Sequence, residues 1–199
     1  MKIFGGVCGL KFVSSLLLLD FSNQFMASLF PKILSGALIL AVLNCSVLAD
    51  TFPISGPISP GNRACLRGGI ACAPSKAPIA VKRAIWAANK LHSKPYHYGG
   101  GHRSFFDRAY DCSGTVSFAL AGAGLINMPL SSSEFRRFGE KGPGRWITIY
   151  ARTGHTFAVI AGLRLDTTPY ITGRERWAPG WQLTRREPIG FDVRHPIGL

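Results

Sequence analysis

The order of periodic patterns along the chain constrains its fold more than any other feature. Residues 79–91 carry apolar side chains three to four positions apart, which is typical of an amphipathic helix. A second helical pattern begins near Cys112 and ends at Gly122 or Gly124. Short β-rich runs punctuated by glycine follow at residues 146–150, 156–160, 163–165 and 190–193. Helices followed by strands predict an α+β domain, with the helices packed on one face of an antiparallel sheet.

The segment before these patterns resembles an export signal. Lys32 precedes an apolar run at residues 33–43, and small residues at Val47 and Ala49 suit cleavage before Asp50. The run is shorter than the roughly 20 residues needed to span a bilayer. We therefore expect residues 1–49 to direct export and then to be removed, leaving no stable membrane span.

The sequence leaves alternatives for two details of this export segment, its start residue and the lipidation of Cys45. Its functional start is expected at Met26, and residues 1–25 hold a second, weaker apolar run. Cys45 follows an apolar stretch that only loosely resembles a lipidation motif, because Asn44 stands where a small residue is preferred. Secretory cleavage is the expected outcome, with lipidation of Cys45 as the alternative.

Residues 50–78 are rich in Pro, Gly, Ser and Ala and show neither the helical nor the strand period. Such a composition predicts a linker or an extended arm. Cys65 and Cys72 lie within it and enclose a short loop that contains glycine. In an oxidising compartment this pair is expected to form a disulfide, because a metal site would need further ligands that are not evident nearby. Residues 79–199 are then the functional domain.

The chain is strongly basic, with 23 Lys and Arg against 10 Asp and Glu. Residues 1–49 hold three of the bases and one of the acids, so the exported part keeps a formal charge of +11. That surplus favours polyanionic surroundings, such as anionic cell-wall polymers, although a solvated basic surface is the plainer alternative. Nucleic acid is not an expected partner, because export removes the chain from it and no nucleic-acid-binding motif is evident.

Cys112 is the candidate nucleophile. If Cys65 pairs with Cys72, it is the odd cysteine of the exported chain. The sequence Asp111-Cys-Ser-Gly114 opens the second predicted helix, where unpaired N–H groups and the helix dipole stabilise a negatively charged sulfur. The alternative is a small, buried cysteine that only packs.

His155 and Asp166 complete a candidate catalytic set. A thiolate that attacks a carbonyl needs a base and then an acid, and imidazole serves as both near neutral pH. His155 opens a predicted strand, and a hairpin turn at Gly162 would return Asp166 to its side. Asp166 is then expected to orient the imidazole. A surface histidine and a turn aspartate are the alternative.

The order of these motifs resembles the NlpC/P60 cell-wall peptidases over about residues 79–193. The matching landmarks are Pro95-Tyr-His-Tyr-Gly-Gly100, Asp111-Cys-Ser-Gly114, Gly142-Pro-Gly144 and Gly154-His155. The resemblance implies a papain-like fold, Cys112 as nucleophile and His155 as base. It also implies hydrolysis of the bond after γ-D-glutamate in peptidoglycan stem peptides.

The resemblance also suggests where substrate binds, and it has two departures. Tyr96, Ser113 and Ser131 are expected to line the substrate groove. Asp166 stands in for the histidine that the family commonly carries about a dozen residues after the base. The loop between Gly101 and Asp111 is longer than usual and aromatic, which leaves the substrate preference open.

The sequence therefore predicts an exported, monomeric cysteine endopeptidase of the periplasm or cell wall, acting on peptidoglycan peptides without a cofactor. No metal site is expected, because the spacing of His92, His97 and His102 does not place them on one helix face. One alternative is an amidase or acyltransferase that uses the same residues on another amide or lipid substrate. The other is a non-catalytic basic module that binds the cell wall.

Overall fold

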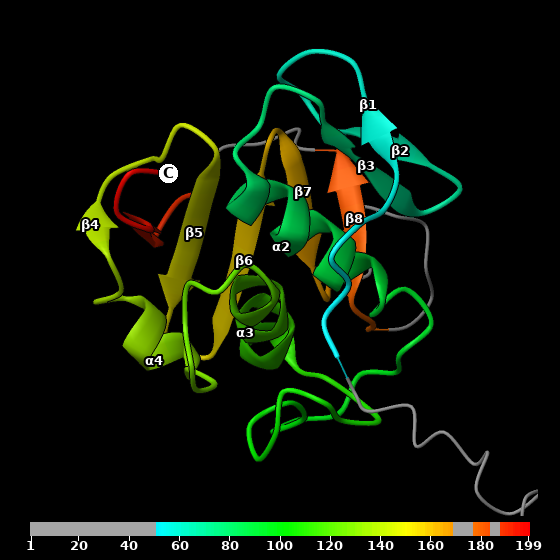
Figure 1. Ribbon diagram of the computed structural model, residues 1–199. Helices are drawn as coiled ribbons and strands as arrows, with labels where there is room; N and C mark the ends of the chain where they lie inside the picture. The colour runs from blue at the N-terminus through cyan, green and yellow to red at the C-terminus, as the bar shows by residue number, and fades with distance from the viewer. Residues whose placement is uncertain (1–50, 169–176, 184–187) are drawn as a thin grey trace, which may run out of the picture. The chain divides into compact units, whose positions relative to one another are not determined.

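An antiparallel sheet organises the fold. The computed structural model describes residues 51–168, 177–183 and 188–199, so the predicted export signal lies outside the described residues. Within these ranges the main sheet has six strands in the order β4-β9-β5-β6-β7-β8 (Figure 1). The strands are β4 (Glu140–Lys141), β5 (Ile147–Arg152), β6 (His155–Ile160), β7 (Leu163–Asp166), β8 (Gly180–Leu183) and β9 (Asp192–His195).

Tight turns fix the register of the three central strands. β5 pairs with β6 from Ile147 opposite Ile160 to Arg152 opposite His155. Gly154, in the turn between them, has a φ of 81°, a conformation that glycine adopts without steric cost. β6 then pairs with β7 so that Ala158 lies opposite Leu165. Asp166 therefore ends β7 close to the beginning of β6.

Two helices pack on the same face of this sheet. α2 (Ile79–Asn89) and α3 (Cys112–Gly122) lie in front of β6 and β7 in Figure 1. Their apolar side chains join those of the sheet in one core whose members include Ile85, Val116, Leu120, Ile149 and Ala158, all fully buried. Burying this apolar surface is the main favourable contribution to the free energy of folding. The predicted α+β class is confirmed.

The N-terminal arm differs from the prediction. Residues 51–78 form a second sheet in the order β1-β3-β2, with β1 at Ile58–Ser59, β2 at Cys65–Arg67 and β3 at Ile70–Pro74. This segment belongs to the same compact unit as the rest of the domain, Ala49–Leu199, so it is not a linker. Its strands are too short to show a period of two, and it fills the core with small side chains such as Ala71 and Ala73.

Asn89 joins this second sheet to the rest of the domain. Its amide oxygen accepts hydrogen bonds from the backbone N–H of Ala71 and from Nε1 of Trp181, both at 2.9 Å. Its amide nitrogen donates to the carbonyl of Ala71, also at 2.9 Å. One side chain at the end of α2 thus connects β3 and β8. Hydrogen bonds from one half-buried amide to two elements in this way help to specify their arrangement.

Cys65 and Cys72 face each other on neighbouring strands. They are directly paired in the register of β2 and β3, and both are free thiols in the structure. Burial and a hydrogen bond with Cys65 raise the pKa of the Cys72 thiol. Directly paired residues of an antiparallel ladder have Cα atoms about 4.5–5.5 Å apart, within the range that disulfides span. The geometry is compatible with the disulfide, which stays a prediction.

We expect this disulfide in protein recovered from the exported compartment. Titration of unreduced, unfolded protein should then find one free thiol in the processed chain. Because the closed loop is short, the bond should add at most about 2–3 kcal/mol to the free energy of unfolding. A count of three free thiols would contradict the pairing.

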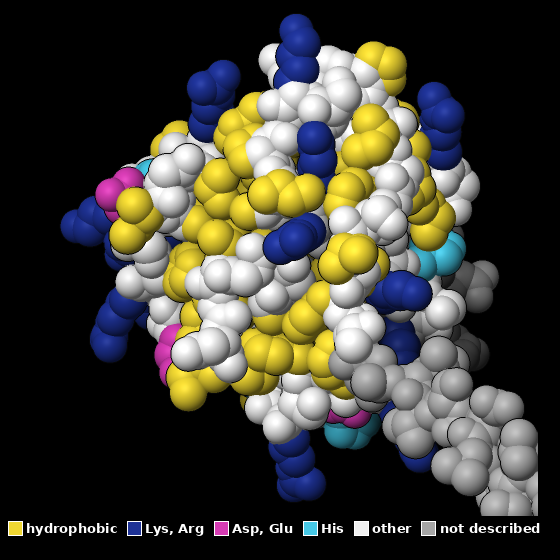
Figure 2. Space-filling view, in the orientation of Figure 1, with side chains coloured by type: hydrophobic (Ala, Val, Ile, Leu, Met, Phe, Trp, Pro, Cys, Tyr) yellow, Lys and Arg dark blue, Asp and Glu magenta, His cyan; other side chains and the backbone are white. Residues whose placement is uncertain are grey.

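The face that carries α2 and α3 is basic, but its Lys and Arg side chains do not gather into one dominant positive patch. Figure 2 shows Lys and Arg side chains spread around this face, with few acidic side chains among them. None of the helices in the described part of the chain carries an apolar stretch long enough to cross a membrane.

Candidate active site

Cys112 is the first residue of α3. The side chain of Asp111 caps this helix by accepting a hydrogen bond from the backbone N–H of Gly114 at 2.7 Å. The first nine residues of α3 are all buried, and Cys112 itself is 8% exposed. The thiol therefore sits at a helix N-terminus within the domain, where the helix dipole favours negative charge.

A glycine-rich loop packs directly on the start of this helix. Asp111 donates its backbone N–H to the carbonyl of Gly100, and its carboxylate accepts from the N–H of Gly99 at 3.0 Å. A Cβ atom at Gly114 would clash with the carbonyl oxygen of Gly100. The Gly-Gly sequence of the loop and the glycine of Asp-Cys-Ser-Gly thus lie against each other, and the absence of a side chain at Gly114 lets the loop backbone come this close to the helix.

The structure brings His155 and Asp166 together with Cys112. His155 opens β6 and Asp166 ends β7, and their Nε2 and Oδ1 atoms are 3.1 Å apart. The contact is an ion pair between the imidazole and the carboxylate. Interaction with Cys112 raises the pKa of His155, so the thiol lies near the imidazole. The imidazole is thus paired with the carboxylate and has the thiol nearby.

Interactions with neighbouring charges shift the pKa values of His155 and Asp166 more than burial does. Burial lowers the pKa of His155, but contacts with Asp166 and Cys112 raise it to about 9. Burial likewise raises the pKa of Asp166, but His155 and Arg164 hold it below its ordinary value. At neutral pH the imidazole is thus protonated and the carboxylate is ionised.

Asp166 is held in place by partners other than His155. Its side chain is fully buried, and its Oδ2 accepts hydrogen bonds from the guanidinium of Arg164 and, at 2.9 Å, from Oγ1 of Thr168. The backbone N–H of Thr167 donates to Oδ1 at 2.6 Å. The guanidinium of Arg164 lies over the ring of Phe157, 3.6 Å from its centroid. This network fixes the carboxylate that faces His155.

Aromatic side chains surround the imidazole. Tyr96 contacts Trp177 with ring centroids 5.8 Å apart, and Trp177 lies edge-on to His155 at 6.5 Å. Phe191 contacts His155 at 6.2 Å. Burial and the charges of Cys112 and Asp111 raise the pKa of Tyr96, which places this tyrosine close to the thiol. The assignment of Tyr96 to the substrate groove stays a prediction.

The hydroxyls of the two serines assigned to the substrate groove take part in structural hydrogen bonds, and their place in the groove stays a prediction. The hydroxyl of Ser113 is buried and donates to Asp111 Oδ1 at 3.1 Å. Ser131 caps α4 (Ser132–Phe135) through a reciprocal capping box with Glu134. Both residues follow landmarks of the motif; Ser131 caps a helix, whereas Ser113 donates to the aspartate that caps α3.

His102 was missed as part of this site by reasoning from sequence. Its Nε2 lies 3.1 Å from Asp111 Oδ1 and 3.0 Å from the hydroxyl of Ser113. The hydrogen bond with Asp111 raises the pKa of His102. The sequence offered one indication that His102 belongs to the site: it lies in the glycine-rich loop, and this loop must approach the Cys112 helix. Within the described residues no group of three His, Cys, Asp or Glu side chains is arranged to hold a metal ion.

Trp177 and Phe191 were also missed. Neither belongs to a recognisable motif, and both reach His155 only through the folding of the segments that follow β7 and precede β9. No local pattern could have assigned them to the site.

Comparison with known proteins finds structural neighbours only. No family model matches the sequence, and no curated protein matches it. The peptidoglycan hydrolase RipB from Mycobacterium tuberculosis is 23% identical, with 60% of this chain and 66% of RipB aligned and a TM-score of 0.46. The P60 domain of an antigen from M. avium paratuberculosis is 21% identical, over 58% of this chain and 93% of that one, with a TM-score of 0.43.

Another neighbour is not an enzyme. RipD from M. tuberculosis, described as a non-catalytic NlpC/p60 domain protein adapted to peptidoglycan binding, is 18% identical, over 58% of this chain and 96% of RipD, with a TM-score of 0.44. RipD and the antigen domain are thus described as NlpC/P60 or P60 domains, the family that the sequence motifs resemble. With identities under 25% and TM-scores under 0.5, these likenesses carry no argument about function. Whether this chain is catalytic must be argued from its own residues.

Proposed function

We propose that this chain is a cysteine hydrolase that cuts amide bonds in peptidoglycan stem peptides, of the γ-D-glutamyl–diamino acid type. The observation that supports the proposal is the ion pair between His155 and the buried Asp166, beside a thiol that is near enough to raise the pKa of His155. A thiol at a helix N-terminus, beside an imidazole that a carboxylate holds, is the arrangement that activates a nucleophilic sulfur. The substrate class rests on the family resemblance.

Each residue of the site has a defined task in this reaction. An imidazolium beside a thiol stabilises the thiolate, so Cys112 attacks the amide carbonyl as a thiolate next to protonated His155. The backbone N–H of Cys112, at the start of α3, stabilises the oxyanion, with the hydroxyl of Tyr96 as a second candidate donor. His155 then gives its proton to the leaving amine, and a thioester forms on Cys112.

Hydrolysis of the thioester completes the cycle. Water attacks the thioester carbonyl, and His155 takes the proton of this water as a general base. The acid product leaves, and the sulfur returns to its starting state beside protonated His155. Asp166 stays ionised throughout and stabilises the imidazolium without transferring a proton. No step requires a cofactor.

The proposed setting is the periplasm or cell wall, which follows from the predicted export signal. The runner-up reaction is amide hydrolysis or acyl transfer on another substrate by the same residues. A non-catalytic wall-binding module is the alternative of a different class, and the basic surface is the observation that favours it (Figure 2).

Digestion of purified muropeptides separates these functions. We expect the protein to convert stem peptides into two products whose masses sum to that of the substrate plus one water, with the new amine on the diamino acid. Mass spectrometry of the products identifies the bond. Binding of muropeptides with no product after prolonged incubation would contradict the hydrolase and favour the binding module.

A further inference from the structure

His102 contacts both neighbours of the proposed nucleophile. Its Nε2 lies 3.1 Å from Oδ1 of Asp111 and 3.0 Å from the hydroxyl of Ser113. Asp111 directly precedes Cys112 in the chain, and Ser113 directly follows it. One side chain of the glycine-rich loop therefore holds the chain on either side of the sulfur, although the proposed reaction gives this histidine no task.

Asp111 is the residue through which His102 can act on the thiol. Its Oδ1 accepts the N–H of Gly114 at 2.7 Å, which caps α3, and its Oδ2 accepts the N–H of Gly99 at 3.0 Å. The side chain of Asp111 is only 8% exposed. Water screens so buried a carboxylate poorly, so its negative charge acts strongly on groups close to it.

This carboxylate lies near the sulfur. Burial raises the pKa of Tyr96, and the negative charges of Cys112 and Asp111 raise it further, so sulfur and carboxylate both lie close to this phenol. Like charges disfavour each other, so an unpaired Asp111 would oppose the Cys112 thiolate that the proposed reaction needs. The carboxylate that caps α3 is therefore unfavourable for the thiolate unless a positive charge offsets it.

His102 can supply that positive charge. The hydrogen bond with Asp111 raises the pKa of His102, and this effect exceeds the opposing effect of burial. At pH 6.5, the ordinary pKa of an imidazole, more than half of the His102 side chains are therefore protonated. Burial raises the pKa of Asp111, but the hydrogen bonds from His102 and Gly114 hold it below its ordinary value. The two side chains thus form an ion pair beside Cys112.

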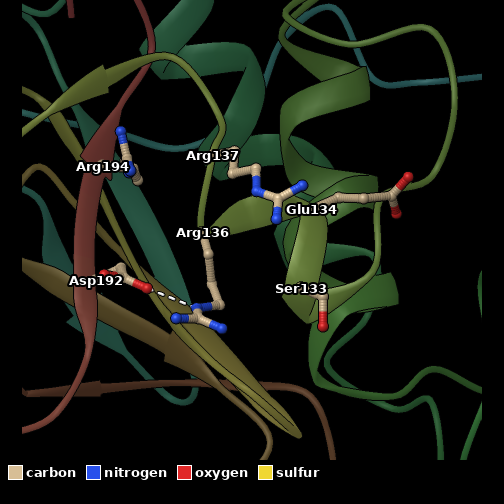
Figure 3. Close-up of a pocket in the computed structure, with 6 residues that line it drawn as sticks. All are labelled: Ser133, Glu134, Arg136, Arg137, Asp192 and Arg194. Carbon is tan, nitrogen blue, oxygen red and sulfur yellow. Dashed lines mark hydrogen bonds and ion pairs between the residues drawn. The ribbon is translucent and has the colours of Figure 1, made fainter.

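Two further carboxylates belong to the surroundings of His102. Glu134, on α4, favours the protonated imidazole through its charge. Figure 3 shows the Glu134 carboxylate directed away from the arginines that line the hollow beside α4. Asp107 accepts backbone N–H groups of its own loop. Among the residues that the structure describes, Asp111 is the one carboxylate in ion-pair contact with His102.

We propose that His102 is a positioning residue for the nucleophile, which as an imidazolium offsets the charge of Asp111 beside Cys112 and holds the first turn of α3. This role deepens the proposed function and rests on it for the identity of the nucleophile. Because His102 acts through Asp111, it should affect the thiolate rather than the binding of the peptide. His102→Gln should therefore lower kcat and leave KM nearly unchanged.

The rate at which iodoacetamide alkylates Cys112 tests this role without requiring turnover, because the thiolate is the reactive form. His102→Gln keeps a neutral N–H donor for Asp111 but removes the positive charge. At pH 6.5 we expect this variant to be alkylated about three- to tenfold more slowly than the unsubstituted protein. The two rates should converge as the pH rises and His102 loses its proton, whereas a purely structural role would give a ratio independent of pH.

A double-mutant cycle shows whether the effect passes through Asp111. Asparagine caps helices as well as aspartate does, so Asp111→Asn keeps the cap and removes the charge. In the Asp111→Asn background, His102→Gln should change the alkylation rate by less than about twofold. His102→Arg, which keeps a positive charge, should be alkylated faster at pH 6.5 than His102→Gln.

The matched control is His97→Gln, because His97 is an exposed histidine of the same loop. This variant should be alkylated at the rate of the unsubstituted protein. Equal rates for His102→Gln and the unsubstituted protein at pH 6.5 would overturn the role. The same slowing with and without the Asp111 charge would also overturn it, as would a His102→Arg variant that is alkylated no faster than His102→Gln.

Alkylation and hydrolysis together distinguish failure of this role from failure of the proposed function. If the alkylation rates follow the cycle but no muropeptide is cleaved, the role of His102 stands and the hydrolase fails. If muropeptides are cleaved and His102→Gln is alkylated as fast as the unsubstituted protein, the hydrolase stands and the role of His102 fails.

Discussion

Replacing Cys112 with serine should abolish peptide hydrolysis, with turnover falling by at least about 10⁴-fold. The hydroxyl is close in size to the thiol but far harder to ionise, so the nucleophile is lost while the packing is kept. Because Cys112 is buried at the start of α3 and its cap is supplied by Asp111, the helix should form as before. The measurement is the initial rate of muropeptide cleavage beside the thermal midpoint of unfolding.

A second thiol-to-hydroxyl change serves as the control for this variant. Cys65 is partly exposed on β2, in the sheet that does not carry His155 or Asp166. Cys65→Ser should therefore retain turnover, even where it lowers stability by removing the predicted disulfide. Turnover at the level of the unsubstituted protein in Cys112→Ser would contradict the mechanism.

Loss of Asp166 should have the second largest effect. We expect Asp166→Ala to lower turnover by roughly 10² or more, because the imidazolium loses its orienting charge. Asp166→Asn should keep part of the activity if its amide oxygen faces the ring. Turnover unchanged in both variants would show that Asp166 has no part in the reaction.

The structure shows that Asp166→Ala also carries a structural cost. The side chain of Arg164 is 14% exposed and pairs with Asp166, so the alanine variant leaves a largely buried guanidinium without its carboxylate. Breaking a buried ion pair in this way costs about 3–5 kcal/mol. Asp166→Asn preserves the shape and part of the hydrogen bonding, so it separates orientation from folding more cleanly. Thermal midpoints should be recorded for both variants.

The pH dependence of Asp166→Asn provides a readout that a purely structural role would not change. Asp166 is among the groups that raise the pKa of His155 from 6.5 to about 9. The stability that protonated His155 contributes is therefore present below about pH 6.5 and is lost as the pH rises through about 9. Activity that needs the imidazolium should fall over the same alkaline range. In Asp166→Asn this alkaline limb should move to lower pH.

The order of helices and strands could be predicted because it rests on local patterns. The helix over residues 79–91 and the strands beside His155 have clear periods, and the structure forms α2 and β6 there. The arm at residues 50–78 could not be recognised as folded. Its strands are two to five residues long and it is buried through small alanines, so its packing depends on distant partners such as Asn89.

The candidate site was predictable only where a motif or a hairpin placed a residue. Cys112 opens a helix, and the turn after β6 returns Asp166 to His155, so these placements follow from local structure. Trp177 reaches the imidazole through the tertiary fold, and no spacing in the sequence indicates it. Ser113 was assigned to the substrate groove from the resemblance alone; its hydroxyl donates to the aspartate that caps α3, and the assignment stays a prediction.

The most direct test of the proposed nucleophile is the activity of unsubstituted protein as Cys112 is progressively alkylated with iodoacetamide. Mass spectrometry of the digested protein measures the labelled fraction of each cysteine. We predict that hydrolysis falls in proportion to the labelling of Cys112 and reaches zero when that residue is fully labelled. Bound substrate should protect Cys112 from labelling. Full labelling of Cys112 with hydrolysis intact would contradict the account.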